Sequence, residues 1–286
     1  MGRTFANNLK TLVLMSILTS LILLAGYAIG GWGGVGIALI FAAVSNFIGF
    51  FFSDKIALAS MQAQEVGPDH PLYKIVKPLA SRAQIPMPRV YVSPQQAPNA
   101  FATGRSQNHA AVCATEGLLQ MLNPKEVSGV MGHELAHVLH RDILIQTVAA
   151  TVAGAISFLG QMWMWNSLMG GRRDDREDNG LGALGGLLVM ILAPIAAGII
   201  QMAISRQREY AADTEGAQLS GDPMNLATAL EKIHYGAARI PMDVSPAFNA
   251  LMIAEPMSLG ERMASMFSTH PRLEDRLMNL IGRERV

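Results

Sequence analysis

The sequence predicts an α+β membrane protein that is mainly helical, with four transmembrane helices and a small β-sheet. Half of its 286 residues are hydrophobic and only 15% are charged, a low charged fraction for a soluble protein. Charged residues are missing from three long stretches, and about 20 apolar residues suffice for one membrane helix. The polar stretches combine short alternating segments with segments of helical periodicity. These patterns indicate membrane helices joined to a mixed domain outside the bilayer.

Three uncharged stretches underlie the membrane prediction. No Asp, Glu, Lys or Arg occurs in residues 11–52, 143–171 or 179–205. The first stretch is too long for one span and is interrupted by the turn-like cluster Gly30–Gly34, so we expect a hairpin of two helices. The other two stretches predict a second hairpin, for which the alternative is a hairpin that lies on the membrane surface without crossing.

Positive charge near the N-terminus predicts the orientation. Residues 1–10 contain Arg3 and Lys10 and no acid, whereas the Gly30–Gly34 turn carries no charge. The positive-inside bias therefore places the N-terminus on the cytoplasmic side of the cytoplasmic (inner) membrane. A cleaved signal peptide is the alternative for the first apolar run, but the length of the run and the second span behind it favour a retained anchor.

The chain divides into four parts on this basis. The first transmembrane hairpin covers residues 1–52 and the second covers 143–205. The polar segments 53–142 and 206–286 each follow a hairpin, so both lie on the cytoplasmic side and together form the catalytic domain.

Periodicity and turn signals predict the elements outside the membrane. We expect helices at 70–83, 116–122, 223–238, 258–267 and 271–283, and strands at 89–92, 99–103 and 110–115. Residues 205–213 are expected to extend the fourth membrane helix beyond the bilayer. The last two strands can pair as an antiparallel hairpin. A further helix begins with Asn123 as N-cap, Pro124 at its first position and Glu126 at its third. We expect this helix to run almost unbroken into the uncharged stretch at Ile143.

This helix carries the sequence His133-Glu134-Leu135-Ala136-His137. Histidines four residues apart share one face of a helix, about 6 Å apart along its axis, and can both turn a nitrogen onto one metal ion. Glu134 then sits beside the metal, where it can take a proton from a metal-bound water and pass it to a leaving amine. The motif predicts a zincin-like catalytic domain, a zinc metalloendopeptidase with one Zn²⁺ per chain, and Glu134 as its catalytic residue.

A catalytic zinc ion takes three protein ligands and keeps one open position, so His133 and His137 need a third partner. His140 lies about 10 Å along the helix from His133, too far for one metal to reach both. Glu209 is the better candidate, because a carboxylate from another helix often completes such a site. Asp213 follows on the same helical face and could orient a ligating histidine. Without a metal motif, the two acids would instead be interpreted as a solvated stripe paired with neighbouring arginines.

Four features in chain order resemble the HtpX-type membrane metalloproteases, relatives of the prenyl-protein (CAAX) endoproteases. They are the double N-terminal span, the segment Asn99-Ala100-Phe101-Ala102-Thr103-Gly104, the motif at 133–137, and the segment Arg208-Glu209-Tyr210-Ala211-Ala212-Asp213. The resemblance spans nearly the whole chain. It implies that Glu209 is the third zinc ligand and that Asp213 supports a ligand.

The resemblance also implies two further roles. Asn99, Ala100, Phe101 and Ala102 would form an edge strand that aligns the substrate backbone; from the residues alone they predict only a strand of a hairpin. The family's His-Pro near the C-terminus is matched by His270-Pro271. His270 could steady the transition-state oxyanion or contact a ligand, and the alternative is a plain helix start with Pro271 at its first position.

The resemblance implies hydrolysis of misfolded or damaged membrane proteins, in membrane protein quality control and the stress response. The expected partners are protein substrates and the lipid bilayer. Zero net charge gives no general attraction to nucleic acid, and a single cysteine, Cys113, allows no intramolecular disulfide. Two alternatives stay open: a specialised endoprotease for lipidated or signal-like peptides, and a non-catalytic membrane scaffold or holdase, against which the intact Glu134 argues.

Overall fold

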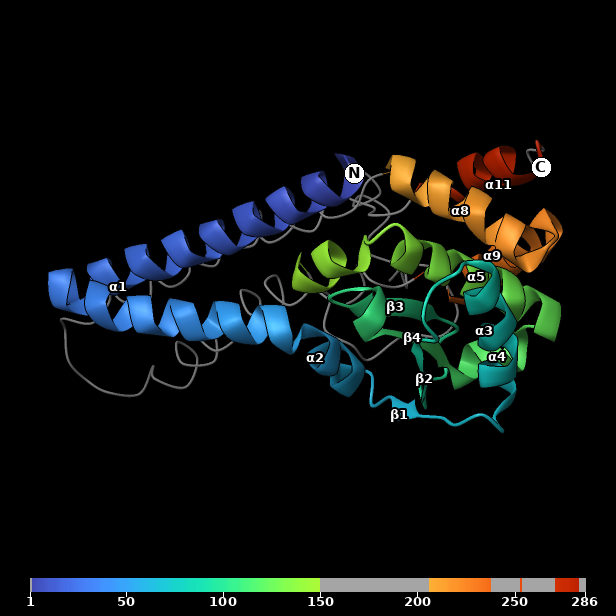
Figure 1. Ribbon diagram of the computed structural model, residues 1–286, viewed down its shortest axis with the longest axis horizontal. Coiled ribbons are helices and arrows are strands. Elements are labelled where there is room, and N and C mark those ends of the chain that lie inside the picture. The colour runs from blue at the N-terminus through green and yellow to red at the C-terminus, as the bar shows by residue number, and fades with distance from the viewer. Residues whose placement is uncertain (1, 150–205, 238–252, 254–270, 283–286) are drawn as a thin grey trace, which may run out of the picture.

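The N-terminal apolar segment forms a helical hairpin that projects from the rest of the protein (Figure 1). The computed structural model describes residues 2–149, 206–237, 253 and 271–282. Helix α1 (Gly2–Phe51) is helical throughout but turns back near Gly31, whose φ of +57° favours glycine. Asn46 Nδ2 donates a hydrogen bond of 2.7 Å to Thr19 Oγ1, which joins the two arms.

One stretch of the described residues, Gly31–Phe51, is long and apolar enough to cross a membrane. The run Leu9–Leu24 in the other arm is apolar but shorter. The second predicted hairpin lies mostly outside the described residues, which include only its first turns, up to residue 149.

A four-stranded mixed sheet forms the base of the polar domain, in the order β1-β2-β4-β3. Its strands are β1 (Gln64–Glu65), β2 (Arg89–Ser93), β3 (Ala100–Gly104) and β4 (Ala110–Thr115). Strands β3 and β4 pair antiparallel as expected, with Phe101 opposite Cys113, whereas β2 runs parallel to β4. The two-residue strand β1 was not predicted, because so short a segment shows no alternation. Strand β3 therefore lies at an edge of the sheet.

The two faces of the sheet pack against different helices because successive side chains point to opposite sides. Ala102 and Val112 join the main core with the helices on one face. Phe101 and Cys113 face α2 (Ser53–Ser60) on the other and pack against Leu58.

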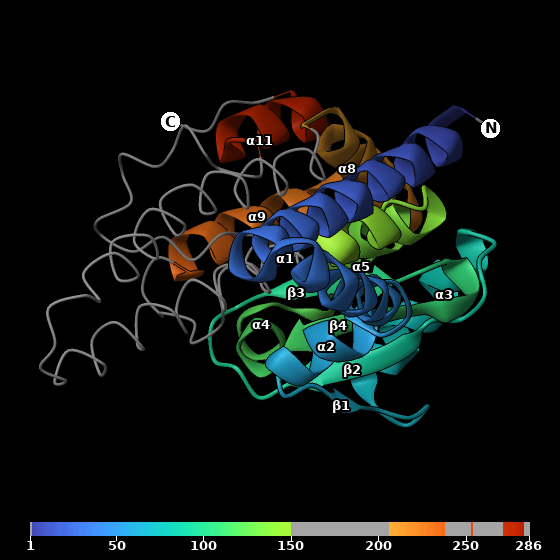
Figure 2. The same cartoon turned by 90° about the vertical axis from the view of Figure 1, so that its left-hand side faces the viewer.

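Helices cover the first face of the sheet in two layers (Figures 1 and 2). Helix α5 lies between the sheet and the C-terminal helices α8, α9 and α11, and α3 packs beside it on the sheet. These elements are α3 (Pro71–Arg82), the 3-10 turn η1 (Gln107–His109), α4 (Glu116–Met121), α5 (Pro124–Leu139), α8 (Arg206–Ser220), α9 (Pro223–Ala237) and α11 (Leu273–Ile281). All except η1 overlap predicted helices, although α8 continues to Ser220, past the predicted end at 213. The helix predicted at 258–267 lies outside the described residues.

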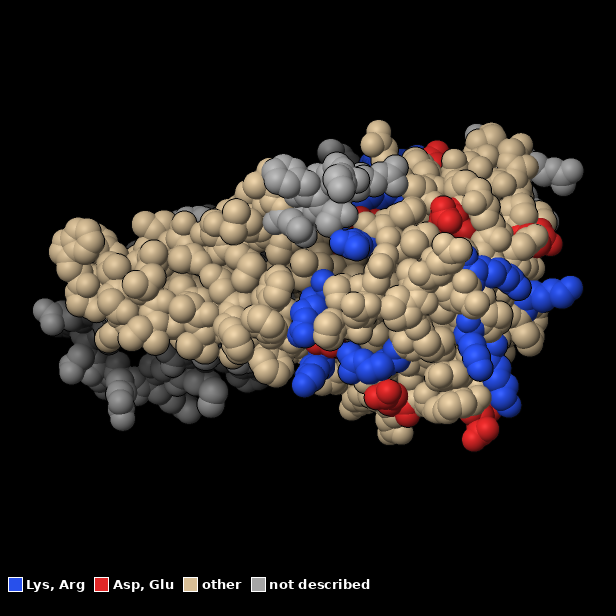
Figure 3. Space-filling view, viewed as in Figure 1, with Lys and Arg blue, Asp and Glu red and all other residues tan. Residues whose placement is uncertain are grey.

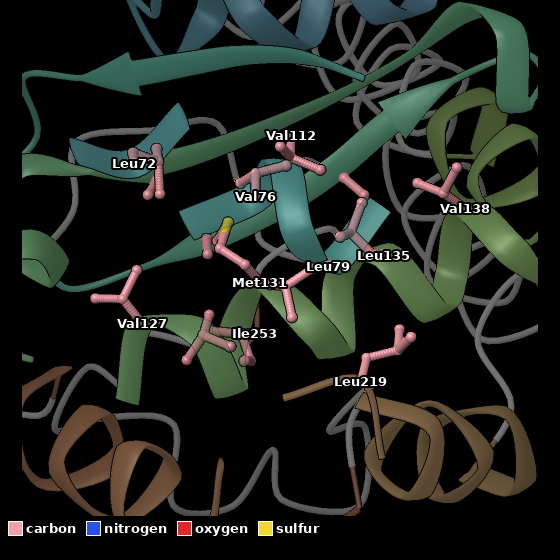
Figure 4. Packing of buried hydrophobic residues seen from close by; sticks show 14 of the residues in the cluster. Leu72, Val76, Leu79, Val112, Val127, Met131, Leu135, Val138, Leu219 and Ile253 are labelled. Carbon is pink, nitrogen blue, oxygen red and sulfur yellow. The ribbon is translucent and has the colours of Figure 1, made fainter. Parts of the chain in front are cut away.

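Helix α5 is the central element and is held at its start by the predicted cap. Asn123 Oδ1 accepts hydrogen bonds from the amides of Lys125 and Glu126, and Glu126 Oε2 accepts one from the Asn123 amide. Lys232 of α9 pairs with Glu126 at 2.7 Å. Apolar side chains of α5 interlock with those of α3, β4 and α8, as the labelled residues of Figure 4 show.

The expectation of a nearly unbroken helix from α5 into the stretch at Ile143 is wrong. Helix α5 ends at Leu139, and Arg141 adopts the left-handed region with φ +59°. The Asp142 amide then donates to the His137 carbonyl, and the helix restarts at Ile143. The break places the Asp142 carboxylate beside His137 at the end of α5.

Helices α5 and α8 cross at a glycine contact. A Cβ atom added at Gly216 would lie 2.5 Å from the His133 amide nitrogen, and one added at Gly132 would lie 2.6 Å from the Gly216 carbonyl oxygen. Both distances are shorter than side-chain carbons tolerate, so neither position accepts a larger residue without a shift of the backbone. The contact places α8 directly against the turn of α5 that begins the motif.

We expect Gly216→Ala to destabilise the protein by about 1–3 kcal/mol, because the added methyl overpacks a backbone contact. Thermal unfolding in detergent measures the effect. Gly67→Ala is the matched control, since a Cβ at Gly67 meets nothing within 4 Å. Equal unfolding temperatures for the two variants would contradict this account of the crossing.

Candidate metal centre

Three buried side chains from two helices converge on one point. His133 and His137 come from α5 and Glu209 from α8, and each is less than 5% exposed. The two histidine Nε2 atoms are 3.2 Å apart, and they lie 3.7 and 3.5 Å from the Glu209 carboxylate oxygens. Ligands at about 2.0–2.2 Å in a tetrahedral arrangement are about 3.4 Å from one another. The spacing and the donor types therefore fit one zinc ion.

His133 is oriented by a pair of side chains from α8 and α11. Its Nδ1 lies 2.8 Å from Asp213 Oδ1, so its Nε2 faces the cluster. Arg276 of α11 donates from Nε and Nη2 to both oxygens of Asp213, at 2.8 and 2.5 Å. Asp213 is fully buried, and of the two histidines it is His133 that its carboxylate contacts.

Arg276 was not predicted from the sequence as part of the site, although its position on an apolar helix face indicates that it is buried. It occupies a position of the apolar stripe that Leu273, Leu277 and Leu280 form on α11. A charged residue on that stripe must be buried and paired if the helix packs. Its side chain is 3% exposed, in contact with Asp213.

His137 has a carboxylate of its own at its outer nitrogen. Its Nδ1 lies 3.6 Å from Asp142 Oδ2, and Arg208 Nη1 lies 3.6 Å from Asp142 Oδ1. The break at Arg141 brings Asp142 to this position. Each histidine thus has an aspartate behind it and an arginine behind the aspartate. Sequence reasoning missed Asp142, because a continuous helix would have directed it away from His137.

The electrostatics of the cluster favour a cation. Burial lowers the pKa of His137, but the carboxylates of Glu209, Asp142 and Glu134 raise it more, so that it reaches about 9 in the metal-free protein. Burial raises the pKa of Asp213, but the Arg276 guanidinium and the His133 ring together lower it by more, so that the pKa lies below its ordinary value. In the metal-free protein, a proton on His137 therefore supplies the positive charge that the surrounding carboxylates favour.

Glu134 is buried next to the ligands, at 3% exposed, and its carboxylate is close enough to raise the pKa of His137. His140 is the C-cap of α5 and does not join the cluster. His270 lies outside the described residues.

The segment expected to align substrate lies on the edge strand β3 and just before it. Asn99 Oδ1 and the Ala100 carbonyl both accept from the Ile253 amide, at 3.0 and 3.1 Å. The Phe101 side chain is buried against α2, on the face of the sheet opposite α5. Ala102 faces the α5 side. Arg276 Nη1 also donates to the Ile253 carbonyl at 3.4 Å, which joins the edge strand to the support of His133.

Asp142→Asn should weaken zinc binding about 10–100-fold, because the amide no longer holds the His137 ring as a carboxylate does. Competition with a chromophoric chelator measures the affinity. Asp54→Asn is the control, since Asp54 also pairs with an arginine, Arg89, but far from the ligands. Unchanged zinc affinity in Asp142→Asn would rule out the orienting role.

The raised pKa of His137 predicts opposite pH effects on metal binding and on metal-free stability. Its proton must leave before the nitrogen can bind metal, so zinc affinity should rise about tenfold per pH unit up to about pH 9. The proton bound in the folded state stabilises the metal-free protein fully below about pH 6.5, and this stabilisation is lost as pH rises to about 9. Calorimetry in buffers of different ionisation enthalpy measures the proton release, and thermal unfolding measures the stability. Zinc binding without proton release at neutral pH would contradict the assignment.

Comparison with known proteins assigns the site to a family. The profile of peptidase family M48 matches residues 68–284. Two proteins named protease HtpX homolog, from Desulfatibacillum aliphaticivorans and Thermodesulfovibrio yellowstonii, are each 50% identical to this chain; the alignments cover 96% of it and 89% and 97% of those relatives. The crystal structure of S. mikatae Ste24p has a similar fold, with a TM-score of 0.52 at 18% identity over 98% of this chain and 67% of that one. The expected resemblance is confirmed, and the chain is a metalloprotease that belongs to peptidase family M48.

Proposed function

We propose that this chain is a zinc endopeptidase of the cytoplasmic membrane that hydrolyses misfolded or damaged membrane proteins. The convergence of His133, His137 and Glu209 beside the buried Glu134 carries the proposal. The apolar span in α1 and the relatives named protease HtpX homolog support a membrane location. In this proposal four helices cross the bilayer and the catalytic domain lies on the cytoplasmic side.

The chemistry divides between the metal and the side chains around it. A zinc ion held by His133, His137 and Glu209 would lower the pKa of a bound water and polarise the substrate carbonyl. Glu134 accepts the proton that this water loses and delivers it to the departing amine as the peptide bond breaks. Asp213 and Asp142 keep the histidine rings turned toward the site throughout.

In this proposal the outer edge of β3 aligns an extended substrate, and the five residues of β3 are buried in the substrate-free protein. The Asn99 carbonyl points toward β4, where it accepts a hydrogen bond from the Thr115 amide. Main-chain N–H and C=O groups alternate in direction from one residue of a strand to the next. The main-chain groups of Ala100, Ala102 and Gly104 therefore point away from β4. Ile253 fills the place beside Ala100. A substrate strand would therefore pair with Ala102 and Gly104.

Pairing through the main chain supports broad specificity. Backbone hydrogen bonds contribute affinity without reading side chains, which suits an enzyme that degrades many damaged proteins. A specialised endoprotease for lipidated or signal-like peptides would instead produce a narrow set of products. Mass spectrometry of peptides released from several unfolded membrane proteins separates the two, and one shared cleavage motif would favour the specialised enzyme.

Glu134→Gln should lower the cleavage rate about 10²–10⁴-fold while the zinc content stays near that of the unchanged protein, because the amide cannot carry the proton. The assay is chelator-sensitive cleavage of casein by detergent-purified protein, with metal content measured on the same sample. Glu116→Gln on the exposed start of α4 is the matched control.

Glu209→Ala should fail in a different way, by losing the metal itself. Full zinc content in Glu209→Ala would rule out Glu209 as the third zinc ligand. Cleavage by Glu134→Gln at the rate of the control would rule out the proton-transfer role of Glu134. Zinc-loaded, unchanged protein that cleaves no substrate would favour a scaffold or holdase.

A further inference from the structure

Two cationic side chains lie over aromatic rings at the end of the apolar span of α1. The Arg105 guanidinium lies 5.3 Å from the ring centroid of Phe51, and Lys55 Nζ lies 5.1 Å from that of Phe52. Both phenylalanines are 40% exposed and belong to an aromatic cluster with Phe47. Rings at the apolar boundary with cations just beyond them match the layering of a membrane surface, where hydrocarbon gives way to phosphate.

Neither cation is neutralised by an acid within the part of the chain that the structure describes. No ion pair joins Arg105 or Lys55 to a carboxylate there, whereas nearby Arg89 pairs with Asp54 at 2.8 Å. Lys55 is exposed and Arg105 is half-buried. In Figure 3, Lys and Arg side chains gather where the uncharged hairpin joins the rest of the protein. Among the described residues, this end of the hairpin therefore presents positive charge without an acidic partner.

Arg105 is also attached to the site. It follows Gly104, the last residue of the edge strand β3, and begins the turn that leads to β4. In the same turn, Gln107 Nε2 donates to the Leu139 carbonyl at the end of α5, at 3.0 Å. A ligand held at Arg105 would therefore act on the end of the strand that is proposed to align substrate.

We propose that Arg105 and Lys55 bind the phosphate groups of anionic phospholipids, and that this contact holds the β3–β4 turn and the edge strand against the bilayer. The proposal rests on the membrane location in the proposed function. Arg105, with its planar fork of donors, suits a phosphate diester, and Phe51 and Phe52 extend toward the acyl chains. The expected consequence is a membrane enzyme whose cleavage of membrane substrates depends on anionic lipid.

Lipid binding is tested without reference to activity. Full-length protein in detergent is titrated with phosphatidylglycerol or phosphatidylcholine, and retained lipid is counted by native mass spectrometry. The double variant Arg105→Gln/Lys55→Gln should retain phosphatidylglycerol about 25-fold less well, since each cation near an anionic surface contributes about fivefold. The control Lys74→Gln/Lys77→Gln removes the same charge from exposed positions on α3 and should bind as the unchanged protein does.

Activity then tests the link to β3. In nanodiscs, phosphatidylglycerol should raise cleavage of a membrane substrate by the unchanged protein but not by the double variant, and casein cleavage in detergent should be equal for both. Equal lipid retention by the two double variants would overturn the lipid site. Displacement of the lipid by inorganic phosphate would also overturn it, in favour of a small-anion site. Lipid binding without an effect on cleavage would overturn the link to β3. Absence of casein cleavage would count against the proposed function alone, because lipid retention is measured separately.

Discussion

The contact between α5 and α8 at Gly132 and Gly216 is the constraint on which the site depends. Glu209 can lie 3.5 Å from His137 only if the two helix backbones approach without intervening side-chain carbons. The other glycine of α5, Gly129, admits the start of α9 in the same way. The capping box and the sheet then hold α5 from its other sides. The ligand geometry is thus a consequence of helix packing.

The buried charges explain why the last helix of the chain takes part in a site whose ligands lie on α5 and α8. Glu134, Asp142, Glu209 and Asp213 are all buried, and Arg208 and Arg276 place fixed positive charge beside Asp142 and Asp213. The remaining carboxylates, Glu134 and Glu209, favour a cation between the ligands. Buried charges are stable only when they are paired in this way. Helix α11 contributes one of the two arginines, so its packing is part of the electrostatics.

The end of the α1 hairpin and the site are joined by short connections. The break at Arg141 sets Asp142 behind His137, and the turn after β3 contacts both Phe51 and the end of α5. In the proposed lipid site, a phosphate at Arg105 would therefore lie two residues from Gln107, whose side chain is bonded to the end of α5.

The sequence alone determined what local spacing controls. Two histidines four residues apart share a helix face whatever surrounds them, the cap at Asn123 uses neighbouring residues, and an uncharged run of sufficient length predicts a membrane helix. Glu209 and Asp213 were reached through the need for a third ligand and through the family resemblance. Only the tertiary structure decided that Asp213 supports His133, that Asp142 turns back to His137, that Arg276 completes the first pair and that Ile253 occupies one end of the edge strand. These contacts join elements far apart in the chain or depend on a single left-handed residue, so no local pattern encodes them.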